Sequence, residues 1–271
     1  MIARWVELLS RYRLVSILVL GLLCAALLLN GHLVPAGDNA TYMILGQSLV
    51  TGHGYRMISD PRSPRMALYP PGYALLLAGL LAATGTVRNL LAAVLPVKVL
   101  SIALYLGALV LIHDMLRWRG STLATVTVLL VAVNPHILHF ANEVGTEIPY
   151  LLLSLCCLWC FERYRRQTSL RALLWVAGFL VLAFYVRSIA LVMAAVFVLH
   201  LCVERKFKHA LLLLLVVGML VTPWFIRTSL LPTTGTSVGL GRGYFSLYFS
   251  SDPYGTTRAS LSDWITRVSQ N

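Results

Sequence analysis

The chain has few charged residues and very few acidic ones. Only 10 of its 271 residues are aspartate or glutamate, and charged residues of all kinds make up 12%, about half of what a soluble domain carries. The sequence is 58% hydrophobic, with a mean hydropathy of +0.79 and long apolar runs, so it predicts a polytopic membrane protein. The runs are too long for barrel strands. Helices are therefore the expected spanning elements, because backbone groups in lipid must be paired internally.

Cysteine provides no framework for disulfides. All five cysteines fall inside apolar runs, where packing of small side chains is a better account than redox or metal chemistry. Cys157 and Cys160 match a C-x-x-C pattern, but their neighbours are apolar and the same account applies.

Nucleic acid is not an expected partner, although the net charge is +12. A nucleic-acid-binding face would combine basic residues with interleaved aromatics, and the sequence has no such pattern. The basic residues instead form short clusters between apolar runs, as cytoplasmic segments of membrane proteins do. These clusters are Arg11 and Arg13, Arg117 and Arg119, residues 163–171 and residues 205–208.

The basic clusters predict which end of each apolar run faces the cytoplasm. The first run follows a basic flank and lacks a small-x-small cleavage site, so we expect an uncleaved anchor that runs outward from a cytoplasmic N-terminus. The segment from Gly72 to Thr84 is too short to span comfortably and is expected at the outer interface or as a dip into the membrane. The expected spans are residues 14–34, 90–116, 122–140, 148–161, 173–186, 189–203 and 210–226.

The expected fold is an all-α membrane protein, a polytopic helical bundle of about seven spans. Residues 35–71 are expected to form an extracytoplasmic first loop with one short interfacial helix near residues 39–50, which Gly52 and Gly54 end. Residues 1–229 would then form the transmembrane module. Residues 230–271 would form an extracytoplasmic C-terminal segment, which we expect to be a truncated form of a longer segment.

Asp38 lies directly after the first expected span. One interpretation is a helix N-cap, because aspartate accepts a backbone hydrogen bond at that position. The other is a general base that removes a proton from an acceptor hydroxyl, or a metal ligand. The residues alone leave both interpretations open.

A second group of polar residues precedes the fourth expected span. His136, His139, Glu143 and Glu147 are spaced three, four and four residues apart, so on a continuous helix they would line one face. His139, Glu143 and Glu147 are candidate ligands of a divalent metal ion, the one cofactor that the residues suggest. Gly145 argues against an unbroken helix, and an interfacial polar rim is the alternative.

Two cations lie at or within apolar runs. Arg187 falls at an outer turn between two spans, and Lys98 lies inside its span. A lone cation there costs roughly 2.5–3.5 kcal/mol on insertion scales. Both residues are candidate contacts for the phosphate of a lipid-linked substrate. For Lys98 the alternative is a stem that reaches back to the headgroups.

The stretch from Tyr69 to Tyr73 contains two prolines and a glycine between two tyrosines. The prolines favour an extended approach followed by a helix start. Tyr69 and Tyr73 are expected at headgroup depth, either as belt aromatics or as a platform on which a sugar stacks.

Several motifs, taken in their order along the chain, resemble those of a known family. They are Asp38-x-x-x-Tyr42, Gly52 to Tyr55, Tyr69 to Leu77, Glu143 to Pro149, and Pro223-Trp224. Together they resemble the integral-membrane GT-C glycosyltransferases, especially bacterial proteins related to the protein O-mannosyltransferases and the lipid A aminoarabinose transferases. The resemblance covers about residues 11–227, and it rests on the order of the motifs because each is weak alone.

The resemblance implies a multi-pass enzyme of the bacterial cytoplasmic membrane with an extracytoplasmic active site. It would transfer a sugar from a polyprenyl-phosphate donor to an acceptor that is a glycan, a lipid or a protein. The acidic residues of the family's first and second outer loops correspond to Asp38 and Glu147, the candidate catalytic residues. The candidate substrate-binding residues are Arg187, Lys98, Tyr42, Tyr69 and Tyr73.

The sequence departs from the family pattern in two ways. Many relatives carry Asp-Glu in the first loop, whereas Asn39 follows Asp38 here, which weakens the case for a metal at that position. Relatives are also longer, so the chain is expected to be the N-terminal part of such an enzyme. Two alternatives stay open: a transporter or flippase for a lipid-linked sugar, and a non-catalytic membrane subunit.

Overall fold

The computed structural model describes residues 2–33, 38–61 and 63–231, and this part of the chain is helical apart from loops and one isolated β-bridge. The expected all-α class is confirmed. The helices are α1 (Ile2–Leu28), α2 (Asn39–Val50), α3 (Gly72–Thr84), α4 (Leu90–Leu116), α5 (Ser121–Ala132), α6 (Pro135–Ala141), α7 (Glu147–Gln167), α8 (Leu170–Val186), α9 (Ala190–Val203) and α10 (Phe207–Ser229).

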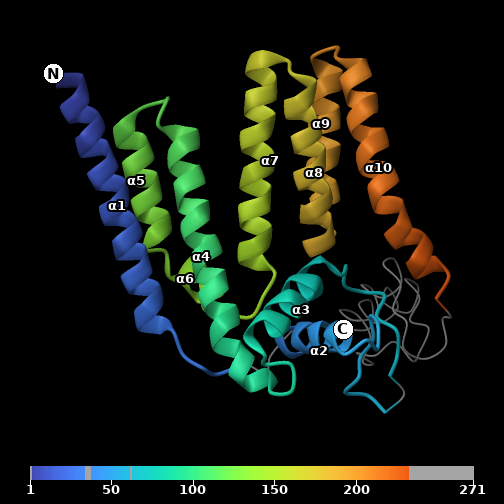
Figure 1. The fold of residues 1–271 in the computed structure, drawn as a ribbon. Coiled ribbons are helices and arrows are strands. Elements are labelled where there is room, and N and C mark those ends of the chain that lie inside the picture. Colours follow the sequence, from blue (N-terminus) through green and yellow to red (C-terminus); the bar gives the residue numbers. More distant parts are fainter. Residues whose placement is uncertain (1, 34–37, 62, 232–271) are drawn as a thin grey trace, which may run out of the picture.

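The long helices run side by side, and α2 and α3 lie together across one end of them (Figure 1). Three clusters of buried apolar side chains hold this arrangement. One lies among α7, α8, α9 and α10, and another among α1, α4, α5 and α6. The third joins α2 and α3 to the first turns of α4. The α2–α3 pair is therefore packed onto the bundle through its own core.

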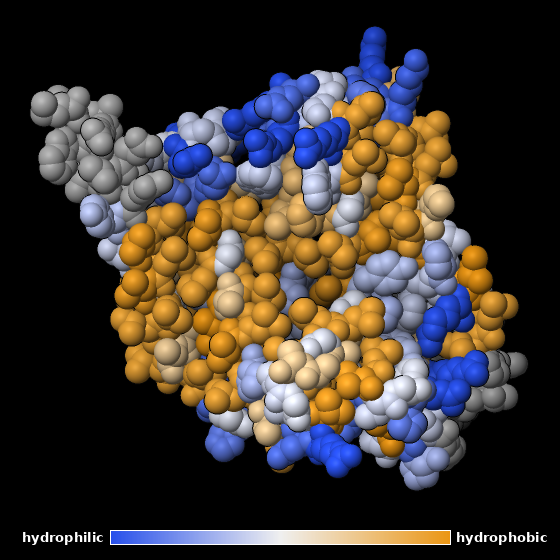
Figure 2. Space-filling view, viewed as in Figure 1, coloured by the Kyte–Doolittle hydropathy of each residue, from blue (hydrophilic) through white to orange (hydrophobic). Residues whose placement is uncertain are grey.

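Two helices, α4 and α10, are long and apolar enough to cross a membrane. The pair α5 and α6 passes the same criterion as one broken span, which raises the number to three among the described residues. Shorter apolar helices accompany them: α3, α8, α9 and the part of α1 from Tyr12 to Leu28. Figure 2 shows the matching surface, a broad hydrophobic belt between two more polar ends. These features indicate a membrane protein.

The bounds of several helices agree with the sequence analysis, but one expected span is wrong as a continuous helix. The run from residue 122 to residue 140 is divided into α5 and α6, which meet at 62°. Pro135 has no backbone N–H to continue the helix and is instead the first residue of α6. Asn134 caps α6 by accepting hydrogen bonds from the backbone N–H groups of His136 and Ile137.

The two ends of the bundle differ in charge. The turns after α4, α7 and α9 share one end, which we call the basic end, and α2, α3, the start of α7 and the end of α8 lie at the opposite end (Figure 1). The basic clusters at residues 117–119, 163–171 and 205–208 belong to the basic end. Asp38, Glu147 and Arg187 belong to the other. This is the alternation that the charge pattern predicts.

Candidate functional site

Asp38 immediately precedes α2, yet its side chain makes no capping hydrogen bond to that helix. The carboxylate is exposed and accepts a hydrogen bond from the phenol of Tyr69 instead. The N-cap interpretation of the side chain is therefore wrong. Tyr69 is 31 residues away, so the carboxylate is held by the far side of the first loop and not by its local backbone.

Three of the candidate substrate-binding residues are tyrosines that form one cluster. The ring of Tyr42 lies 5.1 Å from that of Tyr69 and 5.1 Å from that of Tyr73, measured between centroids. Tyr42 and Tyr73 are buried, with 5% and 2% of their surface exposed. Their faces are covered by protein, so neither provides a sugar platform. Tyr69, which is half-buried, is the member of the trio nearest the surface.

Glu147 and Arg187 form an ion pair, with 2.8 Å between Oε1 and Nη1. Glu147 is the first residue of α7, where the helix dipole favours a negative charge. Arg187 ends α8, and α7 and α8 pack against each other. The pair is half-exposed. Because Arg187 is neutralised by Glu147, it is a weaker candidate for binding a phosphate than the sequence suggests.

Tyr42 lies in the electrostatic field of both candidate carboxylates. Burial and then the charge of Asp38 raise its pKa well above the usual range, Arg187 lowers it, and Glu147 raises it further. The phenol of Tyr42 therefore stays protonated at any physiological pH. The ring of Tyr42 packs against Tyr69, the partner of Asp38, and its phenol hydrogen-bonds Thr146, which directly precedes Glu147. Asp38 and Glu147, although far apart in sequence, therefore lie in a single polar neighbourhood.

Two glycines control how closely the elements of this neighbourhood approach. A Cβ on Gly72 would lie 2.6 Å from the carbonyl oxygen of Tyr185, so α3 starts against the backbone at the end of α8. A Cβ on Gly145 would overlap the carboxylate of Glu147. The glycine of the Tyr69–Tyr73 stretch thus serves close packing, and Gly145 leaves room for the Glu147–Arg187 pair.

Lys98 is buried and is bonded within the protein. Its side chain is only 2% exposed, and its amine donates to Asn30 Oδ1 and to the carbonyl oxygen of His32, both at 2.8 Å. Lys98 thus ties the chain after α1 to α4. This accounts for a buried cation without a substrate.

The predicted metal set of His139, Glu143 and Glu147 is not brought together. The helix breaks between α6 and α7, so the expected ladder does not form a single face. The Nε2 atom of His139 lies 3.3 Å from Oε1 of Glu143, whereas Glu147 pairs with Arg187. In the described ranges no three His, Cys, Asp or Glu side chains are grouped so that they could hold a metal ion.

A pocket that the sequence analysis did not identify lies beside the tyrosine cluster. It has a volume of about 530 Å³, and Arg56, Arg65 and Arg227 line it. Tyr55, also in its wall, donates a hydrogen bond to the carbonyl oxygen of Tyr69 at 3.0 Å, which connects the pocket to the partner of Asp38. Its described lining contains three guanidinium groups and no carboxylate.

The geometry of these arginines is suited to an anion. Arg56 and Arg65 face each other across an antiparallel β-bridge, where like charges repel. Arg227 lies 5.5 Å from the ring of Tyr55 and 5.0 Å from the ring of Trp224, and it donates to a backbone carbonyl at 2.8 Å. Guanidinium groups are well suited to binding the oxygens of a phosphate. We call Arg56, Arg65 and Arg227 the arginine pocket.

Two sequence signals point to the arginine pocket. Tyr55 and Trp224, whose rings are 6.1 Å apart, belong to two of the motifs in the family resemblance, and Arg56 and Arg227 lie within three residues of them. Asp38, the Glu147–Arg187 pair and the arginine pocket thus combine an exposed carboxylate with cations at one end of the bundle. Comparison of the chain with family models, with curated proteins and with solved structures finds no match.

Proposed function

We propose that this protein is a membrane glycosyltransferase that moves a sugar from a polyprenyl-phosphate donor to an acceptor hydroxyl at the α2–α3 end of the bundle. The proposal includes about seven membrane passages, with the basic end in the cytoplasm of a bacterial cell. The observation that carries it is the position of Asp38. Its carboxylate is exposed, is not used as a cap, and lies in the same neighbourhood as Glu147 and Arg187.

The reaction needs one base and a means of stabilising the leaving group. The acceptor oxygen attacks the anomeric carbon, and the new C–O bond forms as the bond from that carbon to the phosphate oxygen breaks, with inversion. Asp38 takes the acceptor's proton, and the polyprenyl phosphate leaves with the electron pair. The hydrogen bond from Tyr69 orients the carboxylate for this step.

The arginine pocket is the best-supported site for the departing phosphate. Tyr55 lies in the wall of this pocket and hydrogen-bonds the backbone of Tyr69, so the three guanidinium groups lie close to the tyrosine cluster. Charge that develops on the leaving oxygen is stabilised most strongly by cations that are already in position. Arg187 holds Glu147 in this scheme and positions it near the acceptor, which is a different role from the phosphate contact expected from its sequence position.

The test is a transfer assay on the purified chain in proteoliposomes, with a labelled polyprenyl-phosphate sugar as donor and a cell-envelope extract as the source of acceptor. We expect Asp38→Asn to lower the rate by about 10²–10⁴ and Arg227→Gln by about 10²–10³. Asp60→Asn and Arg88→Gln remove the same charges elsewhere at this end and serve as controls. Near wild-type turnover in both Asp38→Asn and Glu147→Gln would defeat the proposal.

The same vesicles separate this function from the two alternatives. A flippase moves the donor to the other leaflet and leaves its sugar–phosphate bond intact, so chemical analysis of the lipid distinguishes movement from transfer. A non-catalytic subunit shows neither result until a partner chain is added.

A further inference from the structure

A second arginine-rich cleft lies at the basic end, on the far side of the bundle from the candidate site. It has a volume of about 650 Å³ and is formed by the turn after α4 and the last turns of α7. Five arginines, two tryptophans and two carboxylates line it, together with apolar side chains of α4 and α7. Volumes of this size are typical of ligand sites.

The two tryptophans hold arginines in place. Trp118 has the guanidinium groups of Arg166 at 4.4 Å and Arg119 at 4.9 Å from its ring centre, and Trp159 has that of Arg163 at 4.6 Å. Cation–π contacts fix the direction of a guanidinium group without neutralising its charge. The cations of the cleft are therefore ordered by rings.

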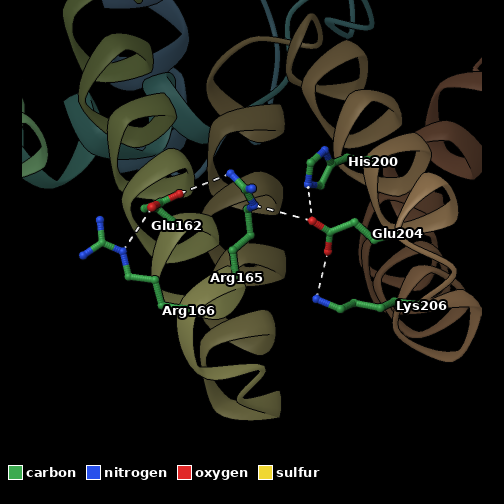
Figure 3. Close-up of polar contacts among 6 residues, drawn as sticks. All are labelled: Glu162, Arg165, Arg166, His200, Glu204 and Lys206. Atoms are coloured by element: carbon green, nitrogen blue, oxygen red, sulfur yellow. Dashed lines mark hydrogen bonds and ion pairs between the residues drawn. The ribbon is translucent and has the colours of Figure 1, made fainter. Parts of the chain in front are cut away.

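Neighbouring carboxylates neutralise only part of this charge. Figure 3 shows Glu162 paired with Arg166 and Arg165, and Arg165 continuing to Glu204 near the turn between α9 and α10. Arg117 pairs with Asp114. The other two arginines of the cleft, Arg119 and Arg163, have no carboxylate within ion-pair distance in the described part of the chain.

Apolar side chains adjoin these two cations. Leu116 and Leu158 line the cleft, and Leu158 is 41% exposed. A free phosphate ion needs no apolar wall, whereas a phospholipid needs cations for its phosphate and apolar surface for the start of its chains. Basic pockets between spanning helices on the cytoplasmic side are suited to such headgroups.

We propose that this cleft binds the phosphate headgroup of an anionic phospholipid, with Arg119 and Arg163 as its main contacts. Trp118 and Trp159 position these contacts, and the apolar side chains of α4 and α7 receive the first part of the acyl chains. The site is separate from the proposed glycosyltransferase site and does not depend on it.

The experiment measures the retention of phosphatidylglycerol relative to phosphatidylcholine on the full chain, by native mass spectrometry after reconstitution in a mixture of the two. We expect the double variant Arg119→Gln/Arg163→Gln to lose about tenfold or more of the preference for phosphatidylglycerol. The control is Arg171→Gln/Arg205→Gln, which removes the same charge from the same end but outside the cleft. Its preference should change less than about twofold.

A second pair of variants keeps every charge. Trp118→Leu removes the ring that contacts Arg119 and Arg166 and should weaken phosphatidylglycerol binding several-fold. Trp175→Leu alters a tryptophan of similar exposure on α8, 56% against 53%, and should leave binding unchanged. Thermal unfolding of each variant in detergent checks that it is folded.

Three results would overturn the proposal. Equal losses in the two arginine doubles would assign the preference to the general charge of the basic end. Unchanged binding in the cleft double would remove the site. Displacement of phosphatidylglycerol by millimolar inorganic phosphate would show a site for the free ion instead of the lipid.

Discussion

Glu147 and Arg187, forty residues apart, form an ion pair of 2.8 Å that joins the first turn of α7 to the residue after α8. The pair lies near the contact between α3 and α8, where Gly72 abuts Tyr185, two residues before Arg187. It therefore connects the packing of two long helices with the tyrosine cluster and Asp38.

A double-mutant cycle should detect this pair. We expect a coupling free energy of about 0.2–1 kcal/mol between Glu147→Gln and Arg187→Gln. The Arg187 side chain is 41% exposed and the Glu147 side chain 33%, so solvent screens the interaction between their charges. The measurement is unfolding of the four proteins in mixed detergent micelles. Strictly additive effects would show that the pair is not formed in solution.

Gly145→Ala should break the same pair without removing a charge. The added methyl group overlaps the end of the Glu147 side chain, which is flexible and can rotate away at small cost. We expect little change in overall stability and loss of the coupling between Glu147 and Arg187. In the Gly145→Ala background, the coupling free energy between Glu147→Gln and Arg187→Gln should be close to zero. A coupling free energy equal to that measured in the wild type would contradict the prediction.

Gly72→Ala should be much more damaging, because its methyl group meets backbone atoms. The new Cβ would lie 2.6 Å from the carbonyl oxygen of Tyr185 and 2.7 Å from its carbonyl carbon, and relief requires α3 to move away from α8. We expect a loss of about 1–3 kcal/mol. Gly79→Ala, in the same helix but with open space around it, is the control and should be neutral or stabilising by up to about 1 kcal/mol.

Much of the helical framework could be predicted because apolar runs and helix-ending residues determine it locally. The ranges 39–50, 72–84 and 90–116 agree with α2, α3 and α4. The break between α5 and α6 was missed, although Pro135 follows a residue that favours an N-cap. Hydropathy alone predicts one continuous helix for an apolar run that contains a proline. The number of membrane spans is not settled by helix length alone, because several of the apolar helices are too short to qualify as spans.

The candidate site could be predicted only in part. The charge pattern correctly assigned Asp38, Glu147 and Arg187 to one end, since it determines the direction of each helix. It could not show that Arg187 is neutralised by Glu147 or that Lys98 is bonded to Asn30, because those contacts join distant segments. The arginine pocket was missed for the same reason: Arg56, Arg65 and Arg227 converge through a loop bridge that has no periodic pattern.

Lys98→Met should test whether this lysine is structural. The substitution leaves Asn30 Oδ1 and the carbonyl oxygen of His32 without their donor, and we expect a loss of about 1–3 kcal/mol. Asn30→Ala should reproduce part of it, and Lys208→Met, an exposed lysine at the basic end, is the control. Unchanged stability combined with weaker donor binding would restore the substrate role that the sequence suggested.

The ion pairs around Glu204 predict a specific dependence of stability on pH. The hydrogen bond and charge of Lys206 hold the pKa of the Glu204 carboxyl below its ordinary value of 4.5, and Glu204 holds the pKa of Lys206 above its ordinary value of 10.5. A lowered carboxyl pKa stabilises the folded state above pH 4.5, and this stabilisation is lost as the pH falls through the lowered value. A raised lysine pKa stabilises it below pH 10.5, and this is lost as the pH rises through the raised value.

Glu204→Gln should therefore be less stable than the wild type by about 0.5–1 kcal/mol between pH 5 and pH 10. The difference should disappear in stronger acid, where Glu204 is protonated. It should shrink at strongly alkaline pH, where Lys206 loses its charge while Arg165, which also pairs with Glu204, keeps its own. Thermal unfolding of both proteins in detergent across this range gives the comparison, and Glu143→Gln, whose partner is a histidine on α6, controls for the loss of an acidic residue as such. A difference between wild type and Glu204→Gln that stays constant into strong acid would show that packing, and not the charge of Glu204, stabilises the turn between α9 and α10.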